Sequence, residues 1–554
     1  MQLPDYKQAG MLLAIALLAI LAVIPLLCIF VTSFYPAQTF DLLAPLKTIM
    51  ASKLSEVFLN SLWLSFCVVA TTTLLALPLA WILAKTDLCR HKWLDIVLTI
   101  PFMTPPYIGS MGWILFMQHN GYLEQLLPSA SAFAPAFFSF SGMVGIMSLH
   151  LFPFLYLILR NTFTEIGGNK EAAAVIHGSG FLYTFRRVIA PLALSGYAMG
   201  ALLIFVKTIS EFGTPATFGR KIGYYVLTSE IHRYLSHWPI DFSKATALAS
   251  VLLSASLLLW YCQTLVSRRF TYQLAGARDS FRKVYRLTVG KRIAAWLYIV
   301  GLLALSVGVP YFSIVSASLM KLRGAGLSWD NLTLQYYFDL LAWGSKSLAA
   351  LLNSLGLSIL AATLSVILGT GCALLIGTGR SRWQRMLDLF SLLPNTVPGI
   401  VMVVGLIIFW NAPQMPIPLY NTYWMVVLTY VILFLPYTVQ YVKANLNQLH
   451  VSLFHAGRVF GGSPLYIFRR IVLPLLRPGM LAGWVMTLTI AIRELVASLL
   501  ILPPSMETSA TYIFSQFEQG NVSLGMAMAV VMVGLTTSLL LLVNQLNPVG
   551  KQRE

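Results

Sequence analysis

Two stretches of this sequence repeat one another: GSGFLYTFRRVIAP at residues 178–191 and GGSPLYIFRRIVLP at residues 461–474. In each stretch an Arg pair begins eight residues after the first glycine, and a proline stands thirteen residues after it. Glycine tolerates the positive φ that ends many helices, and proline suits the first turn of the next helix. The pattern therefore predicts, twice in one chain, a helix–turn–helix that leads into a longer helix.

The repetition extends over the whole chain. Asn60-Ser61-Leu62 returns 293 positions later as Asn353-Ser354-Leu355, and Asp95, Pro101 and Pro105 return at the same offset as Asp388, Pro394 and Pro398. Further along, the offset is 283, which pairs Gly178 with Gly461, Pro191 with Pro474 and Glu211 with Glu494. One insertion in an intervening loop explains the change of offset. We therefore predict two corresponding halves, residues 1–275 and residues 285–554.

The amino-acid composition indicates whether these halves lie in water or in a membrane. Of the 554 residues, 58% are hydrophobic and 10% are charged, whereas soluble domains have roughly 45–50% and 25%. This excludes a water-soluble enzyme, a disordered chain and a coiled coil. The five cysteines are odd in number and include no CxxC pair, which argues against a disulfide scaffold and a structural zinc site.

Twelve apolar segments are long enough to cross a bilayer core, which takes about 20 helical residues. They cover residues 10–34, 58–84, 94–117, 141–163, 194–213, 245–267, 293–317, 348–378, 386–410, 422–444, 479–502 and 522–546. In lipid, backbone polar groups must be satisfied within the segment, as they are in a helix. The predicted fold class is an all-α polytopic membrane protein, with about 12 transmembrane helices in two pseudo-symmetric six-helix halves.

The basic residues predict the orientation. The net charge of +18 comes from 37 Lys and Arg against 19 Asp and Glu. Basic residues concentrate in alternate loops, above all in residues 268–292 between the halves, whereas loops 118–140 and 411–421 carry almost no charge. The positive-inside rule places the basic loops and both termini in the cytoplasm, although the outer loop 214–244 also carries basic residues, among them Arg220, Lys221 and Arg233. We attribute the charge to topology and to docking of a partner on the cytoplasmic loops, and expect no nucleic-acid partner.

Motifs for covalent chemistry are missing from the sequence. It has no GxxxxGK[ST] phosphate-binding loop, no HExxH motif and no GxSxG nucleophile elbow. We therefore expect that the chain is not an enzyme, and that any energy for its work comes from a partner subunit or from an ion gradient.

The two repeated stretches resemble the EAA loops of ATP-binding-cassette importer permeases, in which a short helix docks on the ATPase subunit. The loops span residues 165–192 and 446–475. The resemblance assigns ATPase coupling to Glu171, Ala172, Ala173, Gly178, Pro191, His455, Ala456, Gly457, Gly461 and Pro474. The glutamate of the motif falls on Ala172, one place after Glu171, and on His455 in the second loop. We expect the aromatic residues Tyr183, Phe185, Tyr466 and Phe468 on the loop surfaces, where they can enter a groove of the partner.

Two fused six-span halves resemble in particular the iron(III) permease family of binding-protein-dependent importers, as do the stretches SEFGTPA at residues 210–216 and RELVAS at residues 493–498. The resemblance implies the type I importer fold in the bacterial inner membrane. It also implies two copies of a cytoplasmic ATPase that bind ATP and Mg, one periplasmic or lipid-anchored substrate-binding protein, contact with membrane lipid, and no cofactor on this chain. Related permeases carry thiamine, phosphonates, polyamines or sugar phosphates, so these substrates stay open.

Glu211 and Glu494 are acidic residues at corresponding places of the fifth predicted segments, where charge is costly. Two symmetry-related carboxylates would suit a hard cation. We therefore predict that they line a substrate path together with Arg493, and assign no metal site. Pairing with Lys207 or with Arg493 would explain the two carboxylates without a substrate. Gly196 and Gly200, spaced by three residues, indicate a close contact between helices.

Two other classes of protein stay open on the sequence alone. A secondary transporter often has two six-span repeats but needs no coupling loops, and its transport would collapse with an uncoupler while ATP remained. A membrane scaffold would need neither the acidic pair nor the repeat.

Overall fold

The structure is a computed structural model, and it describes residues 5–35, 39–51, 54–91, 93–166, 171, 174, 176–274, 284–377, 381–416, 418–449 and 451–546. Within these ranges the regular structure is helical, and the extended pairings are two isolated bridges, Thr86 with Tyr285 and Met320 with Leu332. The predicted all-α class is confirmed.

Ten helical segments in the described ranges are long and apolar enough to cross a membrane. They are Gln8–Phe34, Leu54–Lys85, Phe140–Glu165, Leu182–Ile209, Phe242–Ser267, Val289–Leu319, Lys346–Ile376, Tyr423–Leu446, Leu465–Ile492 and Val522–Leu540. Each overlaps one of the predicted segments, but the fifth span of each half begins earlier than predicted, at Leu182 and at Leu465. The fifth span of each half ends earlier than predicted, at Ile209 and Ile492, so Glu211 and Glu494 follow the helix end.

The third segment of each half is broken, which differs from the expectation of twelve continuous helices. In the first half, α5 (Trp93–Met103) is followed by α6 (Pro106–Met117), and in the second half α19 (Arg382–Thr396) is followed by α20 (Gly399–Trp410) at a bend of 110°. The repeated prolines cause the break, because proline removes a helical N–H and disfavours helix at the preceding residue. Pro105 and Pro398 stand directly before α6 and α20.

Four π-helical turns share one cause. They are η1 (Ala19–Val23), η5 (Phe185–Ile189), η7 (Ala304–Gly308) and η10 (Phe468–Val472), and each ends two residues before a proline. Since proline has no N–H, the carbonyl four residues before it loses its α-helical partner, and the helix widens there. The first spans and the repeated loops therefore carry the same kind of break in both halves.

The helices form two compact units that are not the two linear halves. Unit 1 comprises residues 1–48, 231–253 and 334–554, and unit 2 comprises residues 49–230 and 254–333. Unit 2 therefore holds α15 (Val289–Leu303) and α16 (Val309–Leu319), the first span of the second half. Unit 1 holds α1 (Asp5–Leu18) and α2 (Ile24–Phe34), the first span of the first half. The first spans are exchanged, so the predicted division near residue 280 describes the sequence repeat and the units describe the packing.

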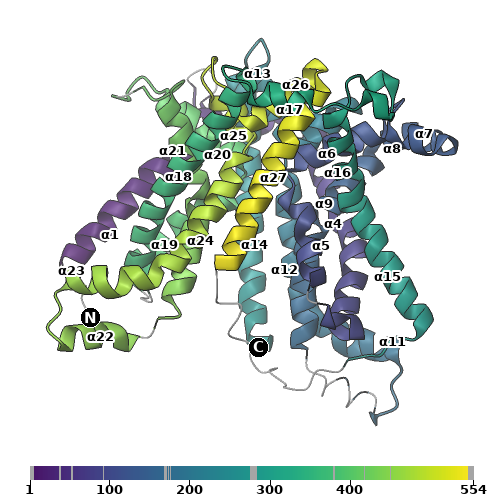
Figure 1. Cartoon of the computed structure of the whole chain (residues 1–554). Coiled ribbons are helices and arrows are strands. Elements are labelled where there is room, and N and C mark those ends of the chain that lie inside the picture. Colours follow the sequence, from purple (N-terminus) through teal and green to yellow (C-terminus); the bar gives the residue numbers. More distant parts are fainter. Residues whose placement is uncertain are drawn as a thin grey trace. The chain divides into compact units, whose positions relative to one another are not determined.

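The same backbone contact holds the exchanged span in each unit. In unit 2, α16 packs on α6, and a Cβ at Gly112 would lie 2.8 Å from both Cα and the carbonyl oxygen of Pro310. In unit 1, α2 packs on α20, and a Cβ at Gly405 would lie 2.5 Å from the carbonyl oxygen of Pro25. Figure 1 shows α16 beside α6. Only glycine permits this approach at either place.

Each unit is centred on three packed helices. They are α4 (Leu54–Lys85), α9 (Phe140–Glu165) and α12 (Ala190–Ile209) in unit 2, and α18 (Lys346–Ile376), α21 (Tyr423–Leu446) and α24 (Leu473–Ile492) in unit 1. The close contact predicted for Gly196 and Gly200 is confirmed, since both pack on α9, against Thr162 and Leu155. Gly479 and Gly483 pack in the same way on Asn445 and Thr438 of α21.

An ion pair that the sequence did not predict recurs in both units. Asp95 of α5 pairs with Arg160 of α9 at 2.8 Å, and the phenol of Tyr156 donates to the same carboxylate at 2.5 Å. In unit 1, Asp388 of α19 pairs with Lys443 of α21 at 2.7 Å. The offset of 293 relates the two aspartates and the offset of 283 relates the two bases. The pairs fix the start of the broken third segment to the fourth span.

The sixth span of each half is α14 (Phe242–Leu274) in the first half and α27 (Val522–Leu546) in the second. The shorter helices are α3 (Ala44–Ala51), α7 (Tyr122–Leu126), α8 (Phe133–Phe137), α11 (Phe181–Thr184), α13 (Leu227–Ser236), α17 (Gln335–Leu341), α22 (Val451–Val459), α23 (Pro464–Ile467), α25 (Val496–Ile501) and α26 (Ser509–Gln519). The 3₁₀ turns are η3 (Asp87–Arg90), η4 (Pro128–Ala130), η8 (Arg323–Ala325) and η9 (Trp329–Asn331), and η6 (Pro215–Gly219) is a further π turn.

The helix contact at Gly479 makes a stability prediction. Gly479→Ala would place a Cβ 2.7 Å from the Cβ of Asn445 and 3.1 Å from the carbonyl oxygen of Tyr441. We expect a loss of about 1–3 kcal/mol, the usual cost of overpacking, measured as a lower melting temperature in detergent. The control is Gly301→Ala in α15, which meets nothing within 4 Å and should be neutral or stabilising, as alanine is the better helix former. Equal melting temperatures for the two variants would contradict the packing argument.

Candidate functional site

The second repeated loop is a helix–turn–helix, as predicted. It begins with α22, which contains His455, Ala456 and Gly457, and turns at Gly461, whose φ is +77°. The N–H of Gly461 donates to the carbonyl of Arg458 at 3.0 Å, and the N–H of Gly462 donates to that of Gly457 at 2.9 Å. These bonds satisfy carbonyls at the end of α22. The chain then continues through α23 and η10 into α24, where Pro474 occupies the first turn.

The first repeated loop turns in the same way. Gly178 also has a φ of +77°, and α11 and η5 lead into α12, with Pro191 in its first turn. The N–H of Ser179 donates to the carbonyl of Ala174 at 3.1 Å. Ala172 and Ala173 lie outside the described residues. The two loops therefore share the glycine turn and the proline entry that the spacing predicted.

The exposed surface of each loop is apolar, but half of the predicted aromatic residues point inward. Tyr183 is 62% exposed and Tyr466 is 58% exposed, next to the exposed Leu182 and Leu465. Phe185 instead packs edge-on against Trp81, with ring centroids 5.5 Å apart. Phe468 packs on the cluster of Ala373, Val442, Ile467, Val472 and Leu476. The expectation that Phe185 and Phe468 enter a partner is wrong, because the helices turn these faces to the spans.

Glu171 is not on the surface of the first loop. Its side chain is 0% exposed and pairs at 2.5 Å with Nζ of Lys85, the last residue of α4, which is 1% exposed. The same ammonium donates to the carbonyl of Ile166 at 2.9 Å, and the phenol of Tyr285 donates to the other carboxylate oxygen at 3.0 Å. We call Lys85, Glu171 and Tyr285 the anchor cluster. Each carboxylate oxygen has its own donor, which a buried charge requires.

Tyr285 brings the segment before α15 into this cluster. Its N–H donates to the carbonyl of Lys85 at 2.8 Å and its carbonyl accepts from the N–H of Asp87 at 3.2 Å. Arg292 and Asp87 form an ion pair beside it. Burial, and then the Glu171 carboxylate, raise the pKa of Tyr285 to about 12. The phenol therefore keeps its proton at any physiological pH and acts as a permanent donor to Glu171.

Glu211 and Glu494 are half-buried and perform the same local task. Both carboxylate oxygens of Glu211 accept the N–H of Thr214 at 3.1 Å, at the start of η6. The carboxylate of Glu494 accepts the N–H of Ala497 at 3.1 Å, in the first turn of α25. A carboxylate at a helix N-terminus satisfies a free N–H and suits the helix dipole. Each glutamate therefore orders the break after the fifth span, and Arg493 lies beside one of them at the end of α24.

The breaks around the two glutamates are further tied by hydroxyl groups. Thr228 donates to the carbonyl of Glu211 at 2.7 Å, and Ser498 donates to the carbonyl of Glu494 at 2.8 Å. Ser498 also bonds the buried phenol of Tyr430 at 2.6 Å. A carboxylate oxygen that accepts one N–H retains a free lone pair. The geometry thus allows contact with a passing cation but does not require it.

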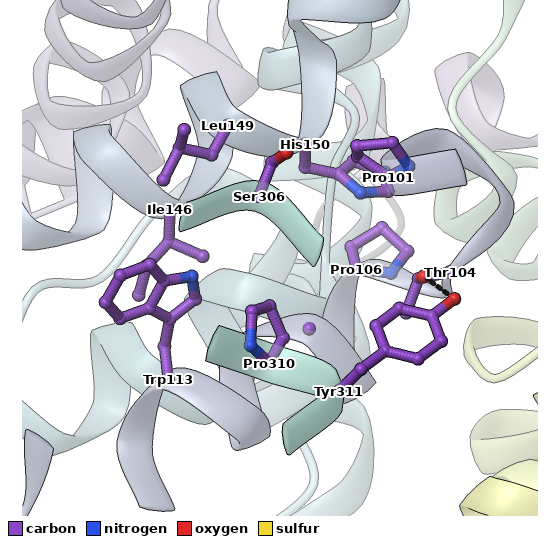
Figure 2. A pocket seen from close by; sticks show the side chains of 11 residues that line it. Pro101, Thr104, Pro106, Trp113, Ile146, Leu149, His150, Ser306, Pro310 and Tyr311 are labelled. Carbon is purple, nitrogen blue, oxygen red and sulfur yellow. Dashed lines mark hydrogen bonds between the residues drawn. The ribbon is translucent and has the colours of Figure 1, made fainter. Parts of the chain in front are cut away.

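A small hollow lies in unit 2 where α5, α6, α9 and η7 meet (Figure 2). Figure 2 shows the side chains of Ser306, His150 and Pro101 around it, and the 2.7 Å hydrogen bond between Thr104 and Tyr311 at its edge. Its volume of about 20 Å³ suffices for one water molecule. It is therefore too small to be a substrate site.

Sequence reasoning missed four charged or phenolic residues of these sites: Lys85, Tyr285, Arg160 and Lys443. The sequence does mark the three basic residues. Arg160 and Lys443 stand at corresponding positions of the repeat, and Lys85 ends a long apolar segment. Nothing in the sequence singled out Tyr285, because its role depends on the exchanged first span that brings it to the end of α4.

Comparison with known proteins agrees with this architecture. Residues 365–549 match the family described as binding-protein-dependent transport system inner membrane component. The ferric transport system permease protein FbpB of Actinobacillus pleuropneumoniae is 25% identical over 96% of this chain and 77% of its own length. Over nearly its whole length the chain is similar to binding-protein-dependent transport permeases. It is a multi-pass inner-membrane protein, and the secondary-transporter and scaffold alternatives are set aside.

Other relatives indicate how this permease is built. The Fe(3+)-transport system permease protein FbpB 2 of Haemophilus influenzae is 25% identical over 89% of this chain and 90% of its own length. A putative 2-aminoethylphosphonate transport system permease protein, PhnV of Salmonella typhi, is 28% identical over 90% of its own length but only 44% of this chain. A half-length permease thus matches about half of this chain, which agrees with a fusion of two permease halves. The relatives are transport permeases and not enzymes.

The anchor cluster predicts a characteristic pattern of stability. Lys85→Met leaves the Glu171 carboxylate buried without its cation, and we expect a loss of about 3–5 kcal/mol, seen as a lower yield and melting temperature. Adding Glu171→Met removes the stranded charge and should restore most of the loss. The control is Lys47→Met, which breaks the exposed pair of Lys47 and Asp41 and should not change the melting temperature. A single Lys85 variant as stable as the control would contradict the burial of the pair.

Proposed function

We propose that this permease carries iron(III) into the cell as the membrane-spanning subunit of an ATP-driven importer. The observation that supports iron is that three relatives matching both halves are named as ferric or Fe(3+) permeases, whereas the phosphonate relatives match one half. Phosphonate is the second candidate, and thiamine, polyamines and sugar phosphates remain alternatives within the same class.

The energy would come from two copies of a cytoplasmic ATPase, which bind ATP and Mg, one on each coupling loop. One periplasmic or lipid-anchored binding protein would deliver the substrate, and both termini would lie in the cytoplasm. The exposed apolar surface around Tyr183 and around Tyr466 and Phe460 supports two docking sites, since aromatic residues at the centre of an interface contribute strongly to binding. No cofactor is assigned to this chain.

The proposed cycle follows from the repeat. Closure of the ATPase pair would move both coupling loops, and each loop continues directly into a fifth span. The break that Glu211 or Glu494 orders stands at the far end of that span. Movement of the loop would therefore reach the two glutamates through one rigid helix of 20 residues, about 30 Å long.

The substrate is tested by reconstitution. The permease, its ATPase and its binding protein are placed in proteoliposomes, and uptake of radioactive iron(III) is measured with and without ATP. ATP-dependent iron uptake that 2-aminoethylphosphonate does not inhibit is the expected result. ATP-dependent uptake of the phosphonate without uptake of iron would overturn the iron assignment and leave the importer class intact.

The two carboxylates are tested in the same assay. Glu211→Gln and Glu494→Gln keep an oxygen for the N–H of Thr214 or Ala497 but remove the negative charge. If the carboxylates line the path, iron uptake falls on the order of tenfold while the melting temperature stays unchanged. Glu507→Gln, another acidic residue of unit 1, serves as the control and should transport normally. Full iron uptake by both glutamine variants would reduce Glu211 and Glu494 to helix caps.

The coupling loops are tested at their turns. Gly178→Val and Gly461→Val force a β-branched residue into a φ of +77°, which costs about 1–2 kcal/mol and distorts the turn without a clash, as both sites are open. We expect weaker co-purification of the ATPase and less transport per ATP. Gly180→Val, at an equally open site without a positive φ, is the matched control. Unchanged ATPase binding and transport in both variants would exclude the loops as the coupling elements.

A further inference from the structure

The two coupling loops are attached to the spans by different chemistry. In unit 2, the first loop is held at its start by the buried pair of Glu171 and Lys85, and further along by Phe185 against Trp81. In unit 1, the second loop rests on an apolar cluster, in which Ile467 and Val472 contact Ala373 and Val442. A buried charge pair has one favourable geometry, whereas apolar side chains can slide and repack at lower cost.

The sequence accounts for this difference between the two loops. At the offsets that relate the halves, the counterparts of Lys85 and Glu171 are Thr378 and Phe454. Neither counterpart carries a charge, so the second half cannot form the pair. By contrast, the ion pair of Asp95 with Arg160 recurs as Asp388 with Lys443. The halves thus keep one ion pair in common and differ in the one that reaches the coupling loop.

The segment between the halves takes part in the anchor. Tyr285 donates to Glu171 at 3.0 Å and also bonds the backbone at Lys85 and Asp87. Trp81 lies beside Tyr285, Phe185 and Phe163, with ring centroids 6.2, 5.5 and 5.5 Å away. The end of α4, the start and second helix of the loop, and the segment before α15 therefore meet at one place.

We propose that Lys85 and Tyr285 are positioning residues that fix the first coupling loop to unit 2 through Glu171, so that the two loops of this permease transmit ATPase movement unequally. The first loop moves together with α4 and α15 as one rigid body. The second loop can shift against the apolar cluster on which it packs. This inference rests on the proposed function for its role in transport, but the unequal attachment itself does not.

The attachment is tested by limited proteolysis of the purified permease. Trypsin can cut at the exposed pairs Arg186–Arg187 in the first loop and Arg469–Arg470 in the second, and cleavage of a folded loop reports its local opening. Tyr285→Phe removes only the hydroxyl that bonds Glu171. We expect cleavage at the first pair to accelerate about tenfold, the effect of one lost hydrogen bond to a carboxylate, while the second pair serves as an internal reference and does not change.

Tyr298→Phe is the matched control. Tyr298 lies on α15 in the same unit and donates its hydroxyl to the carbonyl of Leu75 at 2.7 Å, away from the loop. It should leave cleavage at both pairs unchanged. Equal acceleration in the two tyrosine variants, or acceleration at both Arg pairs, would overturn the anchor. The double variant of Lys85→Met with Glu171→Met gives a second reading, since it removes the pair without a stranded charge and should also open the first loop alone.

The role in coupling is measured in proteoliposomes as substrate transported per ATP hydrolysed. Tyr285→Phe should lower this ratio while ATPase co-purification stays normal, and Tyr298→Phe should not change it. A normal ratio in Tyr285→Phe would overturn the unequal transmission even if the proteolysis result held. If the wild-type permease neither binds the ATPase nor transports, the proposed function fails instead, and the proteolysis result still decides the anchor.

Discussion

The close backbone contact between a proline and a glycine is the constraint on which the arrangement of this permease depends. Pro310 meets Gly112 in unit 2, and Pro25 meets Gly405 in unit 1. Each contact needs both residues, because the proline widens its helix at a π turn and the glycine leaves no Cβ in the way. As a result, the first span of each half is held by the third segment of the other half. The two sequence halves therefore cannot form two independent bundles.

The exchange has a consequence for the segment that joins the halves. Since α15 belongs to unit 2, the chain before it must return to the base of α4. There Tyr285 pairs with the backbone at Lys85 and reaches Glu171. The anchor cluster thus follows from the exchanged span, and a permease assembled from two separate half-length chains would have no covalent segment at this place.

Much of the fold could be predicted from the sequence, because apolar length and a repeat at fixed offsets act over whole segments. Ten spans, the glycine turns at Gly178 and Gly461 and the helix contact of Gly196 and Gly200 follow from local rules. The broken third segments and the ends of the fifth spans did not, since a proline marks a break without giving its position. The exchange of first spans could not be predicted, because it depends on contacts between residues about 200 to 380 positions apart.

The candidate site could likewise be predicted only in part from the sequence. Motif spacing located the two repeated loops. From the sequence, Glu171 was assigned to ATPase coupling and Phe185 and Phe468 were expected on the loop surface, whereas the structure buries Glu171 and packs both aromatic rings against the spans. An ion pair that occurs in both halves belongs to the duplicated fold, as Asp95 with Arg160 and Asp388 with Lys443 show. The buried pair of Lys85 and Glu171 has uncharged counterparts in the second half, so the duplicated fold itself does not require it. A buried pair is costly to form. Among the described residues such a pair reaches the first repeated loop alone, which points to a task that the two loops do not share.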